Sequence, residues 1–376
     1  MSKIDELIEK LCPNGVRFEE LKNKKLFKFY YGKGNKIPED NGGIYNVYGA
    51  NGVVSHINEY NCEDISIIGH IGAVGMVNRC KEKCFVTYNG TIAEVVDKSK
   101  VNSQYLYYVL TTLDLPSYKK GSQPFLSVSD FDKISIPVPP LEVQCEIVHI
   151  LDDFTLLSAE LSAELKARQK QFTYFEEKLL FNNDFEKVKL ADLCIVNQGL
   201  QIPINQRKKE PAGNRYFYIT VQFLKGGDEK YYIESPQPNV ICKKEDILVT
   251  RTGSTGKIIT GVEGCFHNNF FKVEPNERIL KRYLYFVLNS KRMYNKMLRA
   301  ASGGTVPDLP HRKFYNLEIF LPSIEEQEKI INILDRFEKL CNDISEGLPA
   351  EIEARQKQYE YYRDKLLTFK ELKVNE

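Results

Sequence analysis

The stretch IPVPPLEVQCEIVHILDDF (residues 136–154) returns in altered form as IFLPSIEEQEKIINILDRF (residues 319–337). Each copy passes from a strand-like segment through proline, which is tolerated in the first turn of a helix, into an apolar helical pattern. A second pair follows in the same order, ARQKQFTYFEEKLL (residues 167–180) and ARQKQYEYYRDKLL (residues 354–367). The offset is 183 residues for the first pair and 187 for the second. This recurrence predicts an internal duplication of the chain.

Shorter matches extend the duplication toward the start of each copy. They are DISIIGHIGAVG at Asp64 with DILVTRTGSTG at Asp246, KCFV at Lys83 with GCFH at Gly264, and YLYYVL at Tyr105 with YLYFVL at Tyr283. A period near 180 residues is far too long for a solenoid. We therefore expect two copies of one globular domain, each followed by a long helix, related by a pseudo-twofold axis.

The front of each copy is rich in β-branched and aromatic residues punctuated by glycine, asparagine and proline, which is typical of strands and turns. Short helices are expected at residues 105–112 and 283–297. The sequence thus predicts an α+β fold, with two β-rich globular domains separated by two long antiparallel coiled-coil helices. The expected boundaries are 1–140 for the first globular domain, 141–183 for the first long helix, 184–323 for the second globular domain and 324–376 for the second long helix.

Both long helices carry an apolar seam. Its positions alternate three and four residues apart, as in a coiled coil. The first seam is Leu151, Phe154, Ser158, Leu161, Leu165, Arg168, Phe172, Phe175 and Leu179; the second is Leu334, Phe337, Cys341, Ile344, Leu348, Ile352, Arg355, Tyr359, Tyr362 and Leu366. One extra step of four in the second seam is a stutter, which keeps the apolar face nearly in register. Gly347 and Pro349 predict a break or kink there. We expect the seams to pair with each other; separate packing of each helix on its own domain is the alternative.

The first long helix contains a tandem quartet, SAELSAEL (residues 158–165). Four residues are close to one helical turn of 3.6, so adding such a unit changes the helix length while preserving its buried face. The sequence therefore suggests that the number of these units sets the length of the helix, so that the helix acts as a ruler. The alternative is a run of good helix formers with no metric role.

Composition excludes several protein classes. The chain has 376 residues, 42% of them hydrophobic and 27% charged, which is ordinary for a soluble protein of two or more domains. No apolar run has the length of a membrane span, and acidic residues occupy the N-terminus, so we expect a cytoplasmic protein. The nine cysteines are scattered and the five histidines supply no zinc pattern. We expect reduced thiols, no metal and no cofactor.

The net charge of +1 conceals a segregation along the chain. Residues 16–138 hold 15 basic and 13 acidic side chains, and residues 185–320 hold 22 and 13. The helical blocks 141–184 and 324–376 carry −5 and −4. A basic block suits phosphate contact and an acidic block does not.

This layout resembles the specificity subunit of type I restriction-modification systems. The resemblance covers the whole chain and rests on LIEKLCPNGVRFEEL near the N-terminus, the two proline-acid-glutamine stretches, the SAEL tandem and GLPAEIEARQKQYEYYRDKLL near the end. It implies two target-recognition domains that each read one part of a split double-stranded DNA sequence. It also implies helices that space these domains and recruit two methyltransferase subunits, joined by motor-nuclease restriction subunits. Catalysis is then expected to reside in those partners.

Candidate DNA contacts follow from side-chain chemistry, because amides can read adenine, arginine can read guanine, and hydroxyls and lysines can hold phosphates. In the second domain they are Gln201, Gln206, Arg207, Lys208, Lys209, Arg251, Thr252, Ser254, Thr255, Lys257, His267, Asn268, Asn269, Thr305 and Arg312. In the first domain they are Lys33, Asn35, Lys36, His70, Tyr88, Asn89, Lys119, Lys120 and Gln123. Solvated loops are the alternative interpretation for each set.

Other functional classes are less well supported. RTGSTGKI (residues 251–258) resembles a phosphate loop but lacks the first glycine, and Ile258 stands where a serine or threonine is needed. The sequence contains no adenine-methyltransferase signature such as Asn-Pro-Pro-aromatic. A coiled-coil adaptor that binds only proteins remains the alternative function, although it would not need the basic second domain.

Overall fold

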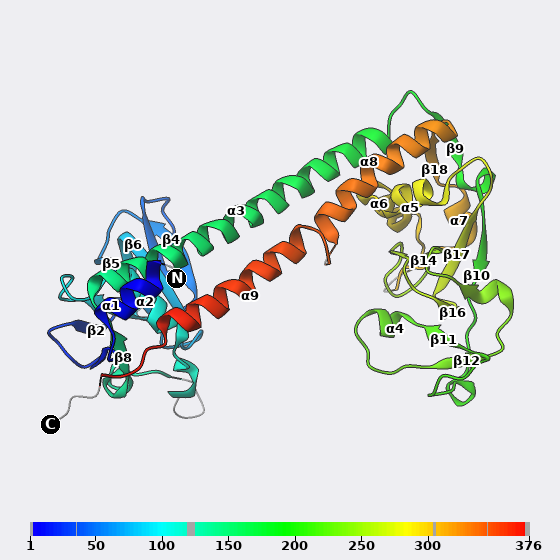
Figure 1. Cartoon of the computed structure of the whole chain (residues 1–376). Coiled ribbons are helices and arrows are strands. Elements are labelled where there is room, and N and C mark those ends of the chain that lie inside the picture. The colour runs from blue at the N-terminus through cyan, green and yellow to red at the C-terminus, as the bar shows by residue number, and fades with distance from the viewer. Residues whose placement is uncertain (1–2, 35, 119–124, 304–305, 344, 373–376) are drawn as a thin grey trace. The chain divides into compact units, whose positions relative to one another are not determined.

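The computed structural model describes residues 3–34, 36–118, 125–303, 306–343 and 345–372 (Figure 1). The chain forms two compact units, Met1–Ser162 together with Ile352–Glu376, and Ala163–Glu351. Each unit combines β-sheets with short helices and with parts of the long helices. Among the described residues, no helix is both long and apolar enough to cross a membrane.

The first unit is built on a six-stranded sheet in the order β2-β7-β5-β6-β3-β4. All neighbours are antiparallel except β3 and β6. The strands are β2 (Phe27–Tyr31), β3 (Tyr45–Gly49), β4 (Gly52–Ile57), β5 (Cys62–Gly69), β6 (Val77–Val86) and β7 (Gly90–Val95). A separate antiparallel pair joins β1 (Arg17–Glu20) to β8 (Ser135–Val138). The helices are α1 (Lys3–Leu11), α2 (Ser103–Thr112), the first part of α3 (Leu141–Leu180) and most of α9 (Leu348–Leu367).

The second unit divides its strands between two four-stranded sheets, β10-β17-β14-β15 and β12-β11-β16-β13. The strands are β10 (Cys194–Gln198), β11 (Arg215–Ile219), β12 (Tyr232–Glu234), β13 (Ile241–Cys242), β14 (Ile247–Thr250), β15 (Ile258–Ile259), β16 (Gly264–Phe266) and β17 (Phe270–Pro275). β9 (Glu186–Lys189) pairs with β18 (Glu318–Leu321) as β1 pairs with β8. The helices are the second part of α3, α4 (Val221–Leu224), α5 (Lys281–Asn289), α6 (Lys291–Ala300), α7 (His311–Tyr315), α8 (Ile324–Asn342) and the first residues of α9.

A buried glutamine joins the long helix to the globular part in each unit. The Gln144 amide accepts a hydrogen bond from the Asn102 main-chain NH at 2.8 Å and donates to the carbonyls of Lys100 and Pro139. Asn102 is the N-cap residue of α2. The side chain has no exposed surface, and its three bonds go to main-chain groups of two segments, residues 100–102 and Pro139.

The second unit repeats this arrangement atom for atom. The Gln327 amide accepts from the main-chain NH of Leu280, the N-cap residue of α5, and donates to the carbonyls of Arg278 and Pro322. A tyrosine on each short helix adds a second equivalent bond: Tyr105 donates to the Pro137 carbonyl and Tyr283 to the Phe320 carbonyl, both at 3.0 Å. The duplication predicted from sequence is therefore present as a shared three-dimensional framework.

The C-terminal segment completes the first unit. Val16 donates from its main chain to the Lys370 carbonyl and accepts from the main chain of Leu372. Gly15 precedes this bridge with a φ of +104°, and a Cβ there would lie 2.4 Å from the Lys370 oxygen. Only glycine fits so close an approach. The segment after α9 therefore lies beside the residue that leads into β1. In the second unit the chain itself makes the equivalent connection, because α3 leads directly into β9.

The predicted seam matches the burial along α3. Leu151 is fully buried, and the other eight seam positions are half-buried, while most residues between them are exposed. In the first unit, Phe154 of α3 stacks on Tyr362 of α9. In the second unit, Phe172 and Phe175 of α3 pack on Phe337 of α8.

The second seam runs through two helices, α8 and α9, which are separated where Gly347 and Pro349 predicted a break or kink. Tyr362 remains 41% exposed despite its stacking contact. Ile344 lies outside the described residues.

Two smaller expectations also need correction. The helix expected at 283–297 is two helices, because Ser290 ends α5 and caps α6 through a bond from the Met293 NH. The match of KCFV to GCFH is displaced by one residue. Thr87 donates from its main chain to Tyr48, and His267 donates in the same way to Ile219, so Thr87 corresponds to His267. Strand pairing sets this register, and the shared Cys-Phe letters do not.

Replacement of Gln144 by methionine should destabilise the first unit. The change preserves size but removes the hydrogen bonds to the buried Pro139 carbonyl and to the partly buried Lys100 carbonyl and Asn102 NH; a buried group left without its partner costs about 1–3 kcal/mol. We expect a loss of about 3 kcal/mol or more, measured by denaturant-dependent hydrogen exchange of the six-stranded sheet. Gln169→Met, on the exposed face of α3, should stay within about 0.5 kcal/mol of the parent. An equally small effect of Gln144→Met would show that the amide bonds are dispensable.

A carboxyl on α3 makes the second unit sensitive to pH. Burial raises the pKa of Glu176 to about 7, and the nearby charges of Glu177 and Glu338 add to this rise. The folded state therefore holds this proton more tightly than the unfolded state, whose pKa is near the ordinary 4.5. The resulting stabilisation is complete below about pH 4.5 and is lost as the pH rises toward 7.

Replacement of Glu176 by glutamine should remove this pH dependence, because the amide cannot ionise. We expect the melting temperature of the variant to rise relative to the parent as the pH increases from about 5 to about 8. Glu160→Gln, at an exposed position of α3, is the matched control and should follow the parent. A difference between Glu176→Gln and parent that is constant with pH would contradict the shifted pKa.

Candidate nucleic-acid interface

The two units share one loop at the end of a central strand, residues 69–76 after β5 and residues 250–257 after β14. In the first loop, the main-chain NH of Gly75 donates to Gly69, and in the second that of Gly256 donates to Thr250, both at 2.8 Å. Gly75 and Gly256 have φ values of +84° and +81°, which favour glycine. The equivalence places His70 and Arg251 at corresponding positions.

Main-chain bonds confirm this correspondence. The NH of His70 donates to the Asn89 carbonyl, and the NH of Arg251 donates to the Asn269 carbonyl. The same two residues accept from Leu126 and Leu309, respectively. The loops therefore have one backbone design with different side chains.

His70 is packed into the first unit. It is 3% exposed, shares a hydrogen bond with the Thr91 hydroxyl at 3.1 Å, and its ring contacts Tyr31 and Phe125. Burial lowers the pKa of His70, which favours the neutral ring. The His70 side chain is therefore packed inside the first unit, where it helps to hold the loop in place.

Arg251 occupies the same place with different chemistry. Its guanidinium makes two hydrogen bonds to the Asp308 carboxylate, at 2.7 and 3.1 Å, and approaches the Gln198 amide oxygen at 3.4 Å. The bonds to Asp308 raise the pKa of Arg251. Arg251 keeps about a third of its side-chain surface exposed, so one edge of the guanidinium faces solvent.

The other predicted residues of this loop are partly engaged. Thr252 donates to the Asn269 side chain, and the buried Thr255 donates to the Pro307 carbonyl at 2.6 Å. Ser254 is half-buried and Lys257 is exposed. The hydroxyls of Thr252 and Thr255 therefore already have hydrogen-bond partners within the protein. Lys257 is the exposed lysine of this loop.

The predicted basic run 207–209 divides into two kinds of residue. Arg207 donates to the Ile202 carbonyl and lies over the rings of Tyr218 and Tyr231, 5.1 and 5.4 Å from their centroids. Lys208 and Lys209 are exposed, and Lys208 pairs through its main chain with β12. Arg207 is thus a packing residue with a charge, whereas the two lysines present their ammonium groups to solvent.

A polar group surrounds Arg207. The His267 ring contacts Tyr218, and burial, together with the charge of Arg207, lowers the pKa of His267. The Asn268 amide donates to the exposed Gln201 at 3.1 Å. The second unit therefore brings loop 250–257, residues 267–269 and the segment after β10 onto one connected surface. Gln206 and Arg312 are exposed on the same unit.

The first unit presents fewer of its predicted residues. Lys33 and Lys36 are exposed, and Lys33 pairs through its main chain with Thr87. Tyr88 is 37% exposed, and Asn89 is half-buried. Five predicted residues lie outside the described part of the chain: Asn35, Lys119, Lys120, Gln123 and Thr305.

Sequence reasoning missed Lys225 and Asp308. The Lys225 ammonium lies 3.4 Å from the Gly253 carbonyl, beside loop 250–257. Asp308 holds Arg251 across 57 residues of sequence. Neither residue belongs to a motif, so only the tertiary contact identifies it.

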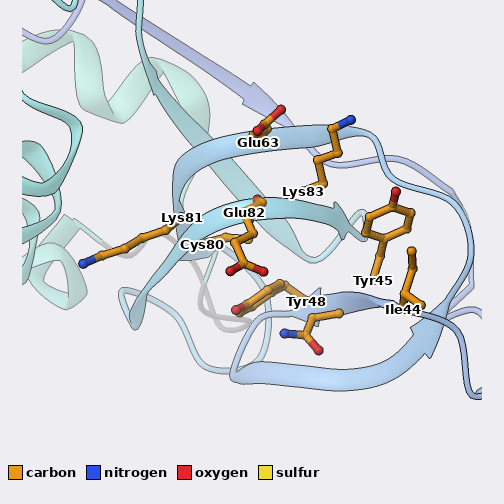
Figure 2. A pocket seen from close by; sticks show the side chains of 9 residues that line it. Ile44, Tyr45, Tyr48, Glu63, Cys80, Lys81, Glu82 and Lys83 are labelled. Carbon is orange, nitrogen blue, oxygen red and sulfur yellow. Dashed lines mark hydrogen bonds between the residues drawn. The ribbon is translucent and has the colours of Figure 1, made fainter.

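A hollow of about 600 Å³ lies between β3 and β6 of the first unit (Figure 2). It is lined by Ile44, Tyr45, Asn46, Tyr48, Glu63, Cys80, Lys81, Glu82 and Lys83. Its lining contains none of the predicted DNA contacts, and acidic and basic side chains alternate around it. The geometry therefore separates this hollow from the loop at residues 69–76.

Comparison with known proteins assigns the family. The model of the type I restriction modification DNA specificity domain matches twice, over residues 15–168 and 182–354. A putative type I restriction enzyme specificity subunit of Haemophilus influenzae is 34% identical, and the alignment covers 86% of this chain and 87% of the relative. The specificity subunit of the Escherichia coli type I restriction enzyme EcoR124I/EcoR124II is also 34% identical, with 73% and 72% covered.

The fold agrees with this assignment. The crystal structure of the type I restriction-modification S subunit from M. genitalium matches with a TM-score of 0.60 at 16% identity, covering 94% of this chain and 96% of that one. At that identity the match concerns the fold alone. The two family matches and the two relatives establish that the chain belongs to the type I restriction-modification DNA specificity family.

Proposed function

We propose that this chain is a non-catalytic DNA-recognition subunit that reads a bipartite, asymmetric sequence within a type I restriction-modification complex. One observation carries the proposal: the two units have the same backbone loop at residues 69–76 and 250–257, but different side chains fill it. Equal units would suit a palindrome, whereas unequal units suit two different half-sites. The adaptor alternative is not favoured, because the relatives are named specificity subunits.

The second unit supplies more of the electrostatic attraction to DNA in this proposal. Residues 185–320 hold 22 basic and 13 acidic side chains, against 15 and 13 in residues 16–138. Four exposed lysines at the predicted contacts or beside loop 250–257 support the same interpretation, since lysines that face solvent can reach phosphates. These are Lys208, Lys209, Lys225 and Lys257.

The proposed partners are two methyltransferase subunits together with restriction subunits. A solved structure that matches this chain with a TM-score of 0.58 is titled for complex assembly of the type I system. Large apolar side chains stand exposed on the long helices, including Leu156 and Tyr174 on α3, Ile333 on α8 and Tyr361 on α9. Exposed apolar surface of this kind suits protein contact. The expected site of action is the cytoplasm, where DNA and these partners meet.

The long helices are proposed to form an antiparallel coiled-coil spacer. The half-buried seam on α3 and the aromatic contacts in each unit support this arrangement. Residues 1–140 and 184–323 are then the recognition domains, and residues 141–183 and 324–376 the spacer. The compact units divide the chain within α3 and α9, so each unit takes a share of both spacer segments.

Removal of two exposed charges should weaken DNA binding in a salt-dependent way. Removing one ion pair between the protein and a phosphate flattens the slope of log affinity against log salt by about 0.9. We expect Lys208→Ala with Lys209→Ala to flatten the slope by up to about 1.8 on a generic duplex, with half-site preference unchanged. Arg207 is left intact because its packing on Tyr218 and Tyr231 would confound the result.

The matched control removes two exposed lysines from α3, Lys166→Ala with Lys170→Ala. The change in net charge is identical, but the proposed spacer does not touch phosphates, so the slope should equal that of the parent. An unchanged slope in the 208/209 variant would place this run away from DNA.

Deletion of one quartet, residues 158–161, should shorten the distance between half-sites without changing the bases read. Four helical residues span about 6 Å and overshoot one turn by about 40°. That angle is close to the roughly 34° between successive base pairs. A helix that lies obliquely to the DNA axis transmits only part of this translation of about 6 Å along the DNA. We therefore expect the DNA spacer between the half-sites to shorten by one base pair. Mapping of methylated sites in cells that supply the partner subunits measures the change.

The control for this deletion preserves the length of the helix. Ser158→Ala with Ser162→Ala removes the hydroxyl bond from Ser162 to the Ser158 carbonyl, and it should leave the spacer unchanged. Identical spacers in the deletion and the parent, or altered half-site bases, would contradict the ruler.

A further inference from the structure

Arg251, which follows β14, keeps part of its hydrogen-bonding capacity after its internal bonds are made. Its Nε and Nη2 atoms donate to the two carboxylate oxygens of Asp308 at 2.7 and 3.1 Å, and its Nη1 atom donates to the Gln198 amide oxygen at 3.4 Å. A guanidinium has five N–H donors in a fixed planar arrangement. Among the described residues, these bonds leave one donor on Nη1 and one on Nη2 without an acceptor. The side chain is 35% exposed, which gives a ligand access to the group.

The partners of Arg251 fix the orientation of the remaining donors. Asp308 holds the guanidinium through two parallel bonds, which define the plane of the group. The Gln198 amide donates to the carbonyls of Asn268 and Phe270, so its oxygen is turned toward Arg251. An arginine held in this way loses little further rotamer freedom when it binds a ligand.

The shared backbone of the loop does not require this ion pair. The equivalent loop of the first unit, residues 69–76, has the same main-chain bonds and carries the buried His70 in place of an arginine. In the second unit, main-chain bonds to Asn269 and Leu309 already hold Arg251. The pair of Arg251 with Asp308 is therefore an addition to the common framework, and its remaining donors point to a role in binding.

The charge of the pair favours a base over a phosphate as the ligand. Asp308 neutralises the guanidinium, so the pair adds little net attraction for DNA, and a phosphate bound there would face a carboxylate. The exposed Lys225 and Lys257 lie beside or on the same loop, have no carboxylate partner among the described residues, and suit phosphate contact better.

Two directed donors require two neighbouring acceptors. In the major groove, guanine presents N7 and O6 as such a pair. Adenine presents N7 beside an amino donor, thymine presents a single acceptor, and cytosine presents an amino donor. Bidentate contact with guanine therefore uses both of the remaining donors of Arg251.

We propose that Arg251 reads a guanine in the half-site of the second unit, through N7 and O6, and that Asp308 and Gln198 are its positioning residues. This inference rests on the proposed function, because it requires that the second unit contacts DNA. The corresponding position of the first unit holds the buried His70, so the two half-sites are read differently there. Lysines beside Arg251 hold the backbone, and Arg251 selects the base.

The test starts from the complex purified from cells that supply the partner subunits, once methylation mapping has defined its bipartite site. Each guanine of the site, on both strands, is replaced singly by 7-deazaguanine, which lacks the N7 acceptor. We expect one position of one half-site at which the affinity of the parent falls about fivefold or more. If no guanine in either half-site shows this loss, the inference is overturned, and this result does not depend on whether any variant folds.

A charge-neutral double variant then assigns that guanine to Arg251. Arg251→Met with Asp308→Asn removes the donors and leaves the net charge unchanged. The 7-deazaguanine penalty should disappear at the one position, the methylation map should accept other bases there, and the slope of log affinity against log salt should equal that of the parent. Asp308→Asn alone should give a smaller loss of guanine preference at the same position, because the guanidinium remains but is less firmly oriented.

The matched control neutralises another exposed ion pair of the second unit, Arg278→Met with Glu186→Gln, and should keep the base preference of the parent. A penalty that persists in the Arg251→Met and Asp308→Asn variant would assign the guanine to another residue and overturn the inference. So would a flatter salt slope with unchanged base preference, which would mark a phosphate contact. In both cases the bipartite site still stands, whereas a parent that reads no bipartite site would overturn the proposed function as well.

Discussion

A glutamine amide at the start of each long helix connects that helix to the segment before a short helix, more than 40 residues earlier in sequence, and to the turn that leads into the long helix. Gln144 and Gln327 each bind the N-cap of a short helix, the carbonyl two residues before that N-cap, and the turn after a β-strand. Both glutamine side chains are fully buried, where an unmade hydrogen bond is costly. The long helix cannot shift along its globular domain without breaking all three bonds at once, so the amide fixes where the helix begins.

Because the start of the long helix is fixed, each unit has the same backbone framework, and different side chains can occupy equivalent positions on it. Tyr105 and Tyr283 brace the same junction, and loops 69–76 and 250–257 share their main-chain bonds. The side chains on this frame differ sharply: a neutral His70 among aromatic rings in one unit, and a charged Arg251 held by Asp308 in the other. Duplication of the framework with divergence of the loops is what recognition of two unlike half-sites requires.

The sequence predicted the framework well because periodicity and repetition report directly on backbone and burial. The heptad spacing identified the covered face of α3 from Leu151 to Leu179, and the extra four residues with Gly347 anticipated the break between α8 and α9. The candidate DNA contacts were harder to judge. Residue type indicates what a side chain can bind, but not whether a distant residue already binds it, and the Arg251–Asp308 pair spans 57 positions. The correspondence of Thr87 to His267 was also missed, because the shared Cys-Phe letters suggested a register that differs by one residue from the strand pairing.

The same limit applies to charge. Residues 185–320 hold many more basic than acidic side chains, yet several of the cations have internal partners. Arg282 bonds to Asp335 and Glu338, and Arg292 bonds to Glu177 of α3, so these positive charges neutralise the acidic helices. The segregation of charge along the sequence therefore has two roles: part of it attaches α3 and α8 to the globular part of the second unit, and the remainder is available to phosphates. Net charge counts both parts equally, whereas only lysines that face solvent without such a carboxylate, as Lys208 and Lys209 do among the described residues, add to the attraction for DNA.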